Sequence, residues 1–289
     1  MYLLFLQDDI VLIARTADGL RELLRVVQYH TSDLKMELST SKSKVMSKSM
    51  DAWEIFGNDD DVVDCLEKVL RFKYLGVESS LSPFQGAIAM KKRALAAARR
   101  YKSACMTVAR DGPDVVDVAM STWLSIGLPC ITFGCESVPF SSTTINEINR
   151  CQVVVGRDAL GLSRCAPSLG VQQILGLRSF KEVLYTAQLK YVVRLQSQPG
   201  ERWSRDAYLD HIYGTWRSPF LENLEKIKRE VGMIRGPVSN KHVDIVVQGH
   251  FRRELSNGIS ELGLPALREV STRRRARHIN ETEEIGGVN

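Results

Sequence analysis

The chain has 289 residues, of which 44% are hydrophobic and 25% are charged, and its formal net charge is +5. This composition is typical of a globular protein, and 20 Gly and 9 Pro are too few for a low-complexity chain. No apolar run approaches the roughly 18 residues that a membrane span needs, and Met1–Leu6 lacks the basic flank of a secretory signal. We therefore expect a nuclear or cytoplasmic protein, not secreted and without a membrane partner, whose six Cys stay reduced.

Residues 1–83 are expected to form a compact α+β unit. Two apolar runs, 2–6 and 10–14, are separated by three polar residues, which predicts a tight β-hairpin. Thr16 is a suitable N-cap for the amphipathic helix that follows. Further strands are expected near residues 44–46, 53–56 and 72–77, with most of the acidic stretch 51–67 in a surface loop.

Residues 84–200 are expected to be mostly helical. The first helix covers 86–110, and the next begins near Pro113 and ends at Gly127. A short extended or turn segment is expected over 128–136.

Two later helices have clear N-terminal signals. Ser141 begins a polar run that suits an N-cap, and Ser179 has capping-box spacing to Glu182. Residues 201–289 show weaker patterns, and we expect them to form a C-terminal extension with a basic, partly disordered tail.

The charges are unevenly distributed. Residues 51–67 contain seven acids and no Lys or Arg, whereas residues 86–110 contain seven bases and no acid. A third cluster, Arg273–Arg277, lies near the C-terminus. Such clusters indicate a polyanionic partner, although a solvated helix face and a charged tail would have the same composition.

Asp8 and Asp9 lie at the centre of the predicted hairpin. Paired carboxylates are ligands that Mg²⁺ prefers, and two metal ions held this way can activate a hydroxyl group and stabilise a leaving pyrophosphate. A plain turn with two Asp residues is the alternative interpretation of this dipeptide.

The run from Leu3 to Ala14 resembles the catalytic hairpin of reverse transcriptases, in which two Asp follow an aromatic and a small residue between apolar strands. The segment Ser41–Met46 resembles the next palm element, and Phe72–Val77 resembles the primer-grip strand pair. Three motifs in this order are more specific than any one of them. The chain is most similar to the polymerases of non-LTR retrotransposons, strongly over 1–77 and loosely to about residue 200.

The resemblance implies an RNA-directed DNA polymerase, a nucleotidyltransferase that uses Mg²⁺, deoxynucleotides, an RNA template and a DNA primer. Residues 1–83 would be the C-terminal part of the palm, and residues 84–200 would be a helical thumb. Asp8 and Asp9 would bind the metal ions as catalytic carboxylates, and Lys42 would help to protonate pyrophosphate. The residues that would contact nucleic acid are Tyr74, Leu75, Gly76, Lys91, Lys92, Arg93, Arg99, Arg100 and Lys102.

Several positions depart from the family pattern. Leu6 and Gln7 replace the aromatic and the small residue before the two Asp, and Ser39 stands where Asn is common. The other metal-binding Asp of the family would lie upstream of Met1, and no second strand here ends in a comparable Asp. We therefore expect a truncated chain that cannot polymerise DNA alone. The alternatives are a non-catalytic remnant that binds nucleic acid and a decayed reading frame without function.

Zinc sites are not supported by the cysteine spacing, because Cys130, Cys135, Cys151 and Cys165 form no CxxC pair and have no accompanying His pair. The five His are scattered along the chain. The pattern does not indicate an oligomeric state.

Overall fold

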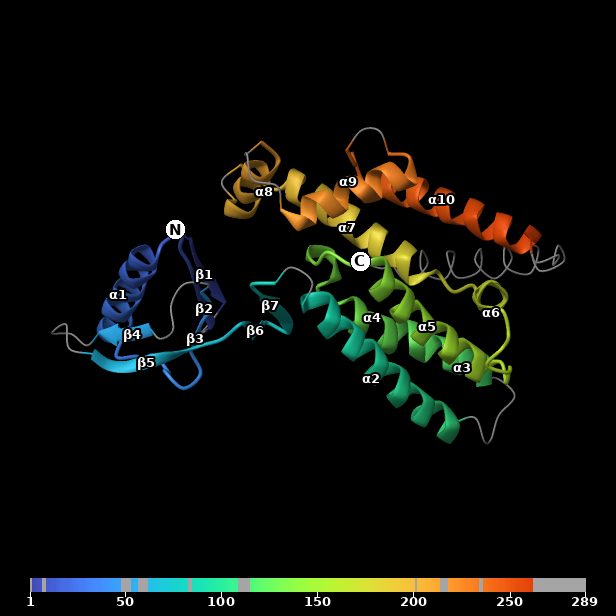
Figure 1. Ribbon diagram of the computed structural model, residues 1–289, viewed down its shortest axis with the longest axis horizontal. Coiled ribbons are helices and arrows are strands. Elements are labelled where there is room, and N and C mark those ends of the chain that lie inside the picture. Colours follow the sequence, from blue (N-terminus) through green and yellow to red (C-terminus); the bar gives the residue numbers. More distant parts are fainter. Residues whose placement is uncertain are drawn as a thin grey trace, which may run out of the picture. The chain divides into compact units, whose positions relative to one another are not determined.

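The computed structural model describes residues 2–6, 9–47, 53–56, 62–82, 85–108, 115–200, 202–213, 218–233 and 236–261. The chain divides into two compact units between Ser82 and Pro83. All the described strands belong to the first unit, and the described part of the second unit is helical, so the layout is α+β (Figure 1). The expected boundary after residue 83 lies one residue from this division.

The first unit opens with the hairpin β1 (Tyr2–Leu6) and β2 (Asp9–Ile13), whose antiparallel register pairs Leu6 with Asp9. Helix α1 (Ala17–Asp33) begins where predicted, because the Thr16 hydroxyl accepts a 3.1 Å hydrogen bond from the Gly19 N–H. Among the side chains that the structure describes in this unit, Val45 and Leu66 are buried together, and Ala17, Leu20 and Leu24 of α1 pack against them.

A three-stranded sheet follows, in the order β3 (Lys44–Val45), β5 (Val62–Lys68), β4 (Trp53–Phe56). Strand β4 is where the sequence predicts it. The loop expected over most of 51–67 is wrong, because β5 occupies its second half and pairs with both neighbours. Its β-branched and apolar residues alternate closely with the acids, and this β pattern outweighs the acidic composition.

The last strands form a second hairpin, β6 (Arg71–Tyr74) and β7 (Val77–Ser80), in which Tyr74 pairs with Val77. The single strand expected over 72–77 is therefore two strands joined by a two-residue turn. Leu75 and Gly76 have φ angles of 47° and 82°, so both lie in the left-handed region that such hairpin turns require.

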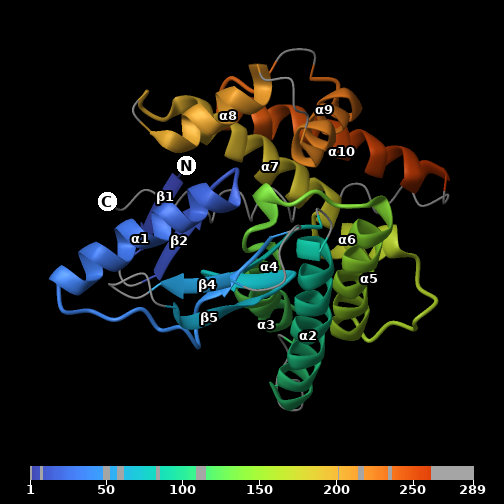
Figure 2. The same ribbon diagram turned by 60° about the vertical axis from the view of Figure 1, so that its left-hand side comes forward.

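The second unit starts with α2 (Gln85–Val108), which lies beside α5 (Ser142–Ala159) in both Figure 1 and Figure 2. After α2 the described chain continues with α3 (Val115–Thr122), a π-helical turn (Trp123–Gly127) and α4 (Leu128–Thr132). A 3-10 turn over Cys135–Ser137, η2, follows α4.

The helix expected to end at Gly127 in fact continues. Gly127 has helical φ and ψ of −64° and −53°, and Pro129, which has no N–H to donate, comes two residues after the π-helical turn in the continued helix. The extended segment expected over 128–136 is therefore wrong. A Cβ atom at Gly127 would lie 2.5 Å from Cε3 of the fully buried Trp123, so the glycine is needed for packing rather than as a stop.

The rest of the unit is built around α7 (Phe180–Ser197), half of whose residues are buried. The Ser141 and Ser179 caps are confirmed by hydrogen bonds from the Thr144 and Glu182 N–H groups. The remaining helices are α6 (Ser168–Leu175), α8 (Trp203–Tyr213), α9 (Pro219–Val231) and α10 (Asn240–Glu261).

The structure does not separate the segment expected to start an extension at residue 201. Leu224, Ile227, Val243 and Val247 of α9 and α10 are buried in the same core cluster as α7. Residues 262–289, including Arg273–Arg277, lie outside the described residues. None of the described helices is both long enough and apolar enough to cross a bilayer.

Candidate nucleic-acid interface

The hairpin β1–β2 carries one of the two predicted carboxylates. Asp9 is the first residue of β2, opposite Leu6 at the turn end of the hairpin. Asp8, the other predicted metal ligand, lies outside the described residues. The backbone therefore places Asp9 where two short strands meet, and the arrangement of the two carboxylates stays a prediction.

Lys42 lies in the exposed turn that leads into β3. Its backbone N–H donates to the Ser39 carbonyl at 3.2 Å, and the next N–H, of Ser43, donates to the same oxygen at 2.9 Å. The turn is thereby fixed while the Lys42 side chain is exposed. Lys44, two residues on, pairs with Glu67 of β5 at 2.5 Å and so has a structural role in the sheet.

The predicted primer-contacting residues form the end of the β6–β7 hairpin. Tyr74 is half-buried, whereas Leu75 is 44% exposed and Gly76 is exposed at the turn. A leucine at φ 47° is unusual, since a left-handed conformation costs an L-residue with a Cβ roughly 1–2 kcal/mol. The hairpin thus presents a large apolar side chain at its tip from a strained backbone position.

The six predicted bases of α2 fall into three groups. Two are used within the helical unit: Lys91 pairs with Glu147 of α5 at 2.8 Å, and Arg93 Nη2 donates to the Phe133 carbonyl at 3.0 Å. The side chain of Lys102 lies outside the described residues. The third group is exposed and comprises Lys92, Arg99 and Arg100.

These three exposed bases share one side of α2, because positions i, i+7 and i+8 lie on one face of an α-helix. Ile88 and Leu95 lie on the same side and are 41% and 40% exposed. The face therefore combines three cations with apolar side chains, a surface that suits contact with a phosphate backbone.

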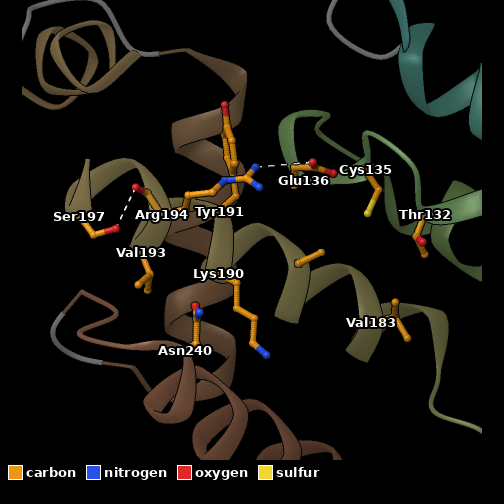
Figure 3. Close-up of a pocket in the computed structure, with 11 residues that line it drawn as sticks. Thr132, Cys135, Glu136, Val183, Lys190, Tyr191, Val193, Arg194, Ser197 and Asn240 are labelled. Carbon is orange, nitrogen blue, oxygen red and sulfur yellow. Dashed lines mark hydrogen bonds and ion pairs between the residues drawn. The ribbon is translucent and has the colours of Figure 1, made fainter. Parts of the chain in front are cut away.

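An open groove of about 520 Å³ lies along α7, and sequence reasoning missed it (Figure 3). Two of its lining residues are cations, and each has an acidic neighbour: Lys190 pairs with Asp244 at 2.8 Å, and Arg194 with Glu136 at 3.8 Å. Figure 3 shows Arg194 turned toward Tyr191, over whose ring its guanidinium lies at 5.0 Å. The i, i+4 spacing of the two cations was the available sequence signal.

The groove contains no reactive thiol. Burial, with a smaller effect from Glu136, raises the pKa of the Cys135 thiol to about 12, so this group stays protonated at neutral pH. Since both groove cations are paired, its charge is largely compensated. The exposed face of α2 is the stronger candidate for a polyanion.

No protein-family model, curated protein or solved structure matches this chain. The functional argument therefore rests on the chain's own residues.

Proposed function

We propose that this chain is part of a reverse transcriptase of the non-LTR retrotransposon type, and that by itself it binds an RNA–DNA primer–template without polymerising DNA. The observation that carries the proposal is the succession of elements in the first unit. A hairpin whose second strand begins at Asp9, the residue after Asp8 in the sequence, is followed by an amphipathic helix, a strand that begins just after Lys42, and a second hairpin turning at Leu75 and Gly76.

In this proposal Asp8 and Asp9 hold Mg²⁺, and Lys42 is the nearby cation. The donor set suits Mg²⁺, since both side chains offer carboxylate oxygens. When bound, the ion supplies charge stabilisation for nucleotidyl transfer. Two-metal chemistry needs carboxylates from a second strand, and none of the strands that the structure describes ends in an Asp. On these strands the carboxylate set is incomplete, and we expect no synthesis by this chain alone.

The binding activity is assigned to the exposed face of α2. Lys92, Arg99 and Arg100 could neutralise three phosphates, and each neutralised phosphate contributes about −0.9 to the slope of log affinity against log salt. Three contacts give a slope of about −2.7, which corresponds to roughly 40-fold weaker binding between 50 and 200 mM salt.

The test uses the full chain, a fluorescent RNA–DNA duplex, and anisotropy titrations at several salt concentrations. Replacing Lys92, Arg99 and Arg100 together by Gln should weaken binding and reduce the salt slope by about 2–3. The matched control replaces three exposed bases of other helices, Arg150, Lys226 and Lys241, and should leave both quantities nearly unchanged.

Equal losses in the two triple variants would show that binding is only a net-charge effect and would overturn the assignment to α2. The catalytic half of the proposal has its own assay. Template-dependent, Mg²⁺-dependent primer extension by the purified chain would overturn the expectation that it is inactive alone. Absence of duplex binding at low salt would favour the alternative of a decayed reading frame.

A further inference from the structure

A polar cluster lies where α7, α9 and α10 meet in the helical unit. The Glu230 carboxylate on α9 accepts hydrogen bonds from the Tyr185 hydroxyl at 2.7 Å and from the Lys181 ammonium, both on α7. His250 and Glu254 stand one turn apart on α10, with Nε2 and Oε1 separated by 3.4 Å. One donor atom from each of Glu230, His250 and Glu254 lies within 4.8 Å of the other two.

The imidazole of His250 faces the two carboxylates of this cluster. Its side chain is only 16% exposed, and its Nε2 atom is buried without a hydrogen bond to any described residue. The groups that face it are two carboxylates, which in their ionised form offer only acceptor atoms. A protonated Nε2 can donate to these carboxylates, whereas the lone pair of a deprotonated Nε2 and the two carboxylates together offer three donor atoms to one dication.

The surroundings of Glu230 favour its ionised form, which is the form that binds a metal ion. Burial by itself would raise the pKa of this carboxyl, but the hydrogen bonds from Lys181 and Tyr185 outweigh burial and hold the pKa below its ordinary value. The Tyr185 hydroxyl also fixes the orientation of the carboxylate, as outer-shell hydrogen bonds do around metal ligands.

We propose that Glu230, His250 and Glu254 bind one late transition-metal dication, represented by Zn²⁺. His and Glu at i and i+4 share one helix face, and the third ligand comes from the adjacent helix. One imidazole nitrogen with two carboxylate oxygens is a three-ligand set that Zn²⁺ accepts, with a fourth position left for water. Mg²⁺ prefers an octahedral set of oxygens and should not compete here.

Lys181 opposes metal binding, and this gives the proposal a distinctive signature. Its ammonium group pairs with Glu230 and lies 5.5 Å from the centre of the Tyr185 ring and 5.7 Å from that of Phe251. A dication must displace this positive charge or tolerate it nearby. Removing the charge with Lys181→Met should therefore strengthen metal binding several-fold. Most substitutions in and around a metal site have the opposite effect and weaken metal binding.

The experiment uses the tag-free full chain with Cys130 and Cys165 replaced by Ser, so that these two exposed thiols do not bind the probe metals. Co²⁺ is titrated by visible absorption and displaced by Zn²⁺, with excess Mg²⁺ present throughout. We expect one Co²⁺ per chain, a loss of roughly 100-fold in affinity with His250→Ala, and tighter binding with Lys181→Met.

The matched controls are His30→Ala, which removes an exposed His of the first unit, and Glu222→Gln, which removes an exposed carboxylate of α9. Both should retain wild-type affinity. Binding that is equally tight in the His250→Ala variant, or that is lost with His30→Ala, would overturn the proposal. If circular dichroism shows that His250→Ala does not fold, Glu254→Gln takes its place, with the same criterion. None of these readouts depends on the proposed polymerase origin.

Discussion

Gln188 connects three elements of the helical unit through a fully buried amide. Its Nε2 donates to the carbonyls of Cys135 at 3.2 Å and Val138 at 2.7 Å, and its Oε1 accepts from Asn223 Nδ2 at 2.8 Å. Its side chain is 0% exposed. The substitution Gln188→Leu keeps a similar volume, removes all three hydrogen bonds, and leaves two carbonyls and one amide without their partner.

The magnitude follows from these contacts. Three hydrogen bonds at about 1 kcal/mol each give about 3 kcal/mol, and the desolvated groups left behind add to this, so we expect a loss of about 3–5 kcal/mol. This is a large part of the 5–15 kcal/mol that usually stabilises a domain. With a slope of about 2 kcal/mol per molar urea, the midpoint should fall by roughly 2 M.

The assay is urea unfolding followed by far-UV circular dichroism, which reports mainly on the helical unit. The matched control is Gln196→Leu on the same helix, where the side chain is exposed and makes one weak hydrogen bond of 3.4 Å to Tyr208. Its effect should be within about 0.5 kcal/mol. A Gln188→Leu variant within about 1 kcal/mol of wild type would refute the reasoning that these buried hydrogen bonds stabilise the unit.

Three further predictions concern local geometry and pH. In thermal melts, Gly127→Ala should destabilise the helical unit by about 1–3 kcal/mol, because the new Cβ meets the buried Trp123 ring. Gly249→Ala, with open space around it, should stabilise the same unit by about 0.5–1 kcal/mol. Leu75→Asn should stabilise the β6–β7 hairpin by about 1 kcal/mol, measured by hydrogen exchange, because Asn tolerates a positive φ. An unchanged hairpin stability would mean that the turn is unstrained. The pKa of Glu230 is lowered in the folded state, so its contribution to stability is complete at neutral pH and is lost as the pH falls through that lowered pKa. The stability difference between Glu230→Gln and wild type should shrink over that range, and a constant difference would contradict this.

Elements with local signals could be predicted from the sequence, and those that depend on distant contacts could not. The caps at Thr16, Ser141 and Ser179 are visible because donor and acceptor lie three residues apart. The continuation of the helix through Gly127 depends on how the Trp123 ring packs. Strand β5 depends on pairing with two neighbours, which composition does not reveal.

The candidate sites show the same limit. Periodicity identified the bases of α2 as a set, but the partners of Lys91 and Arg93 lie on other elements, and only the structure separates these two from the exposed bases. In the metal cluster, the i, i+4 spacing of His250 and Glu254 is present in the sequence. The third ligand, Glu230, belongs to another helix, and pattern alone could not connect it to them.

The division at Ser82 also separates charge of opposite sign. Residues 1–82 carry 10 Lys and Arg against 14 Asp and Glu, whereas residues 83–289 carry 29 against 20, so the two units have net charges of −4 and +9. Charges in water are screened over about 10 Å at 0.1 M salt, so an approaching polyanion responds to each unit separately. It is attracted by the helical unit and repelled by the unit that carries Asp8 and Asp9. Divalent cations bound at the acidic unit would lower the barrier to a polyanion's approach to that unit.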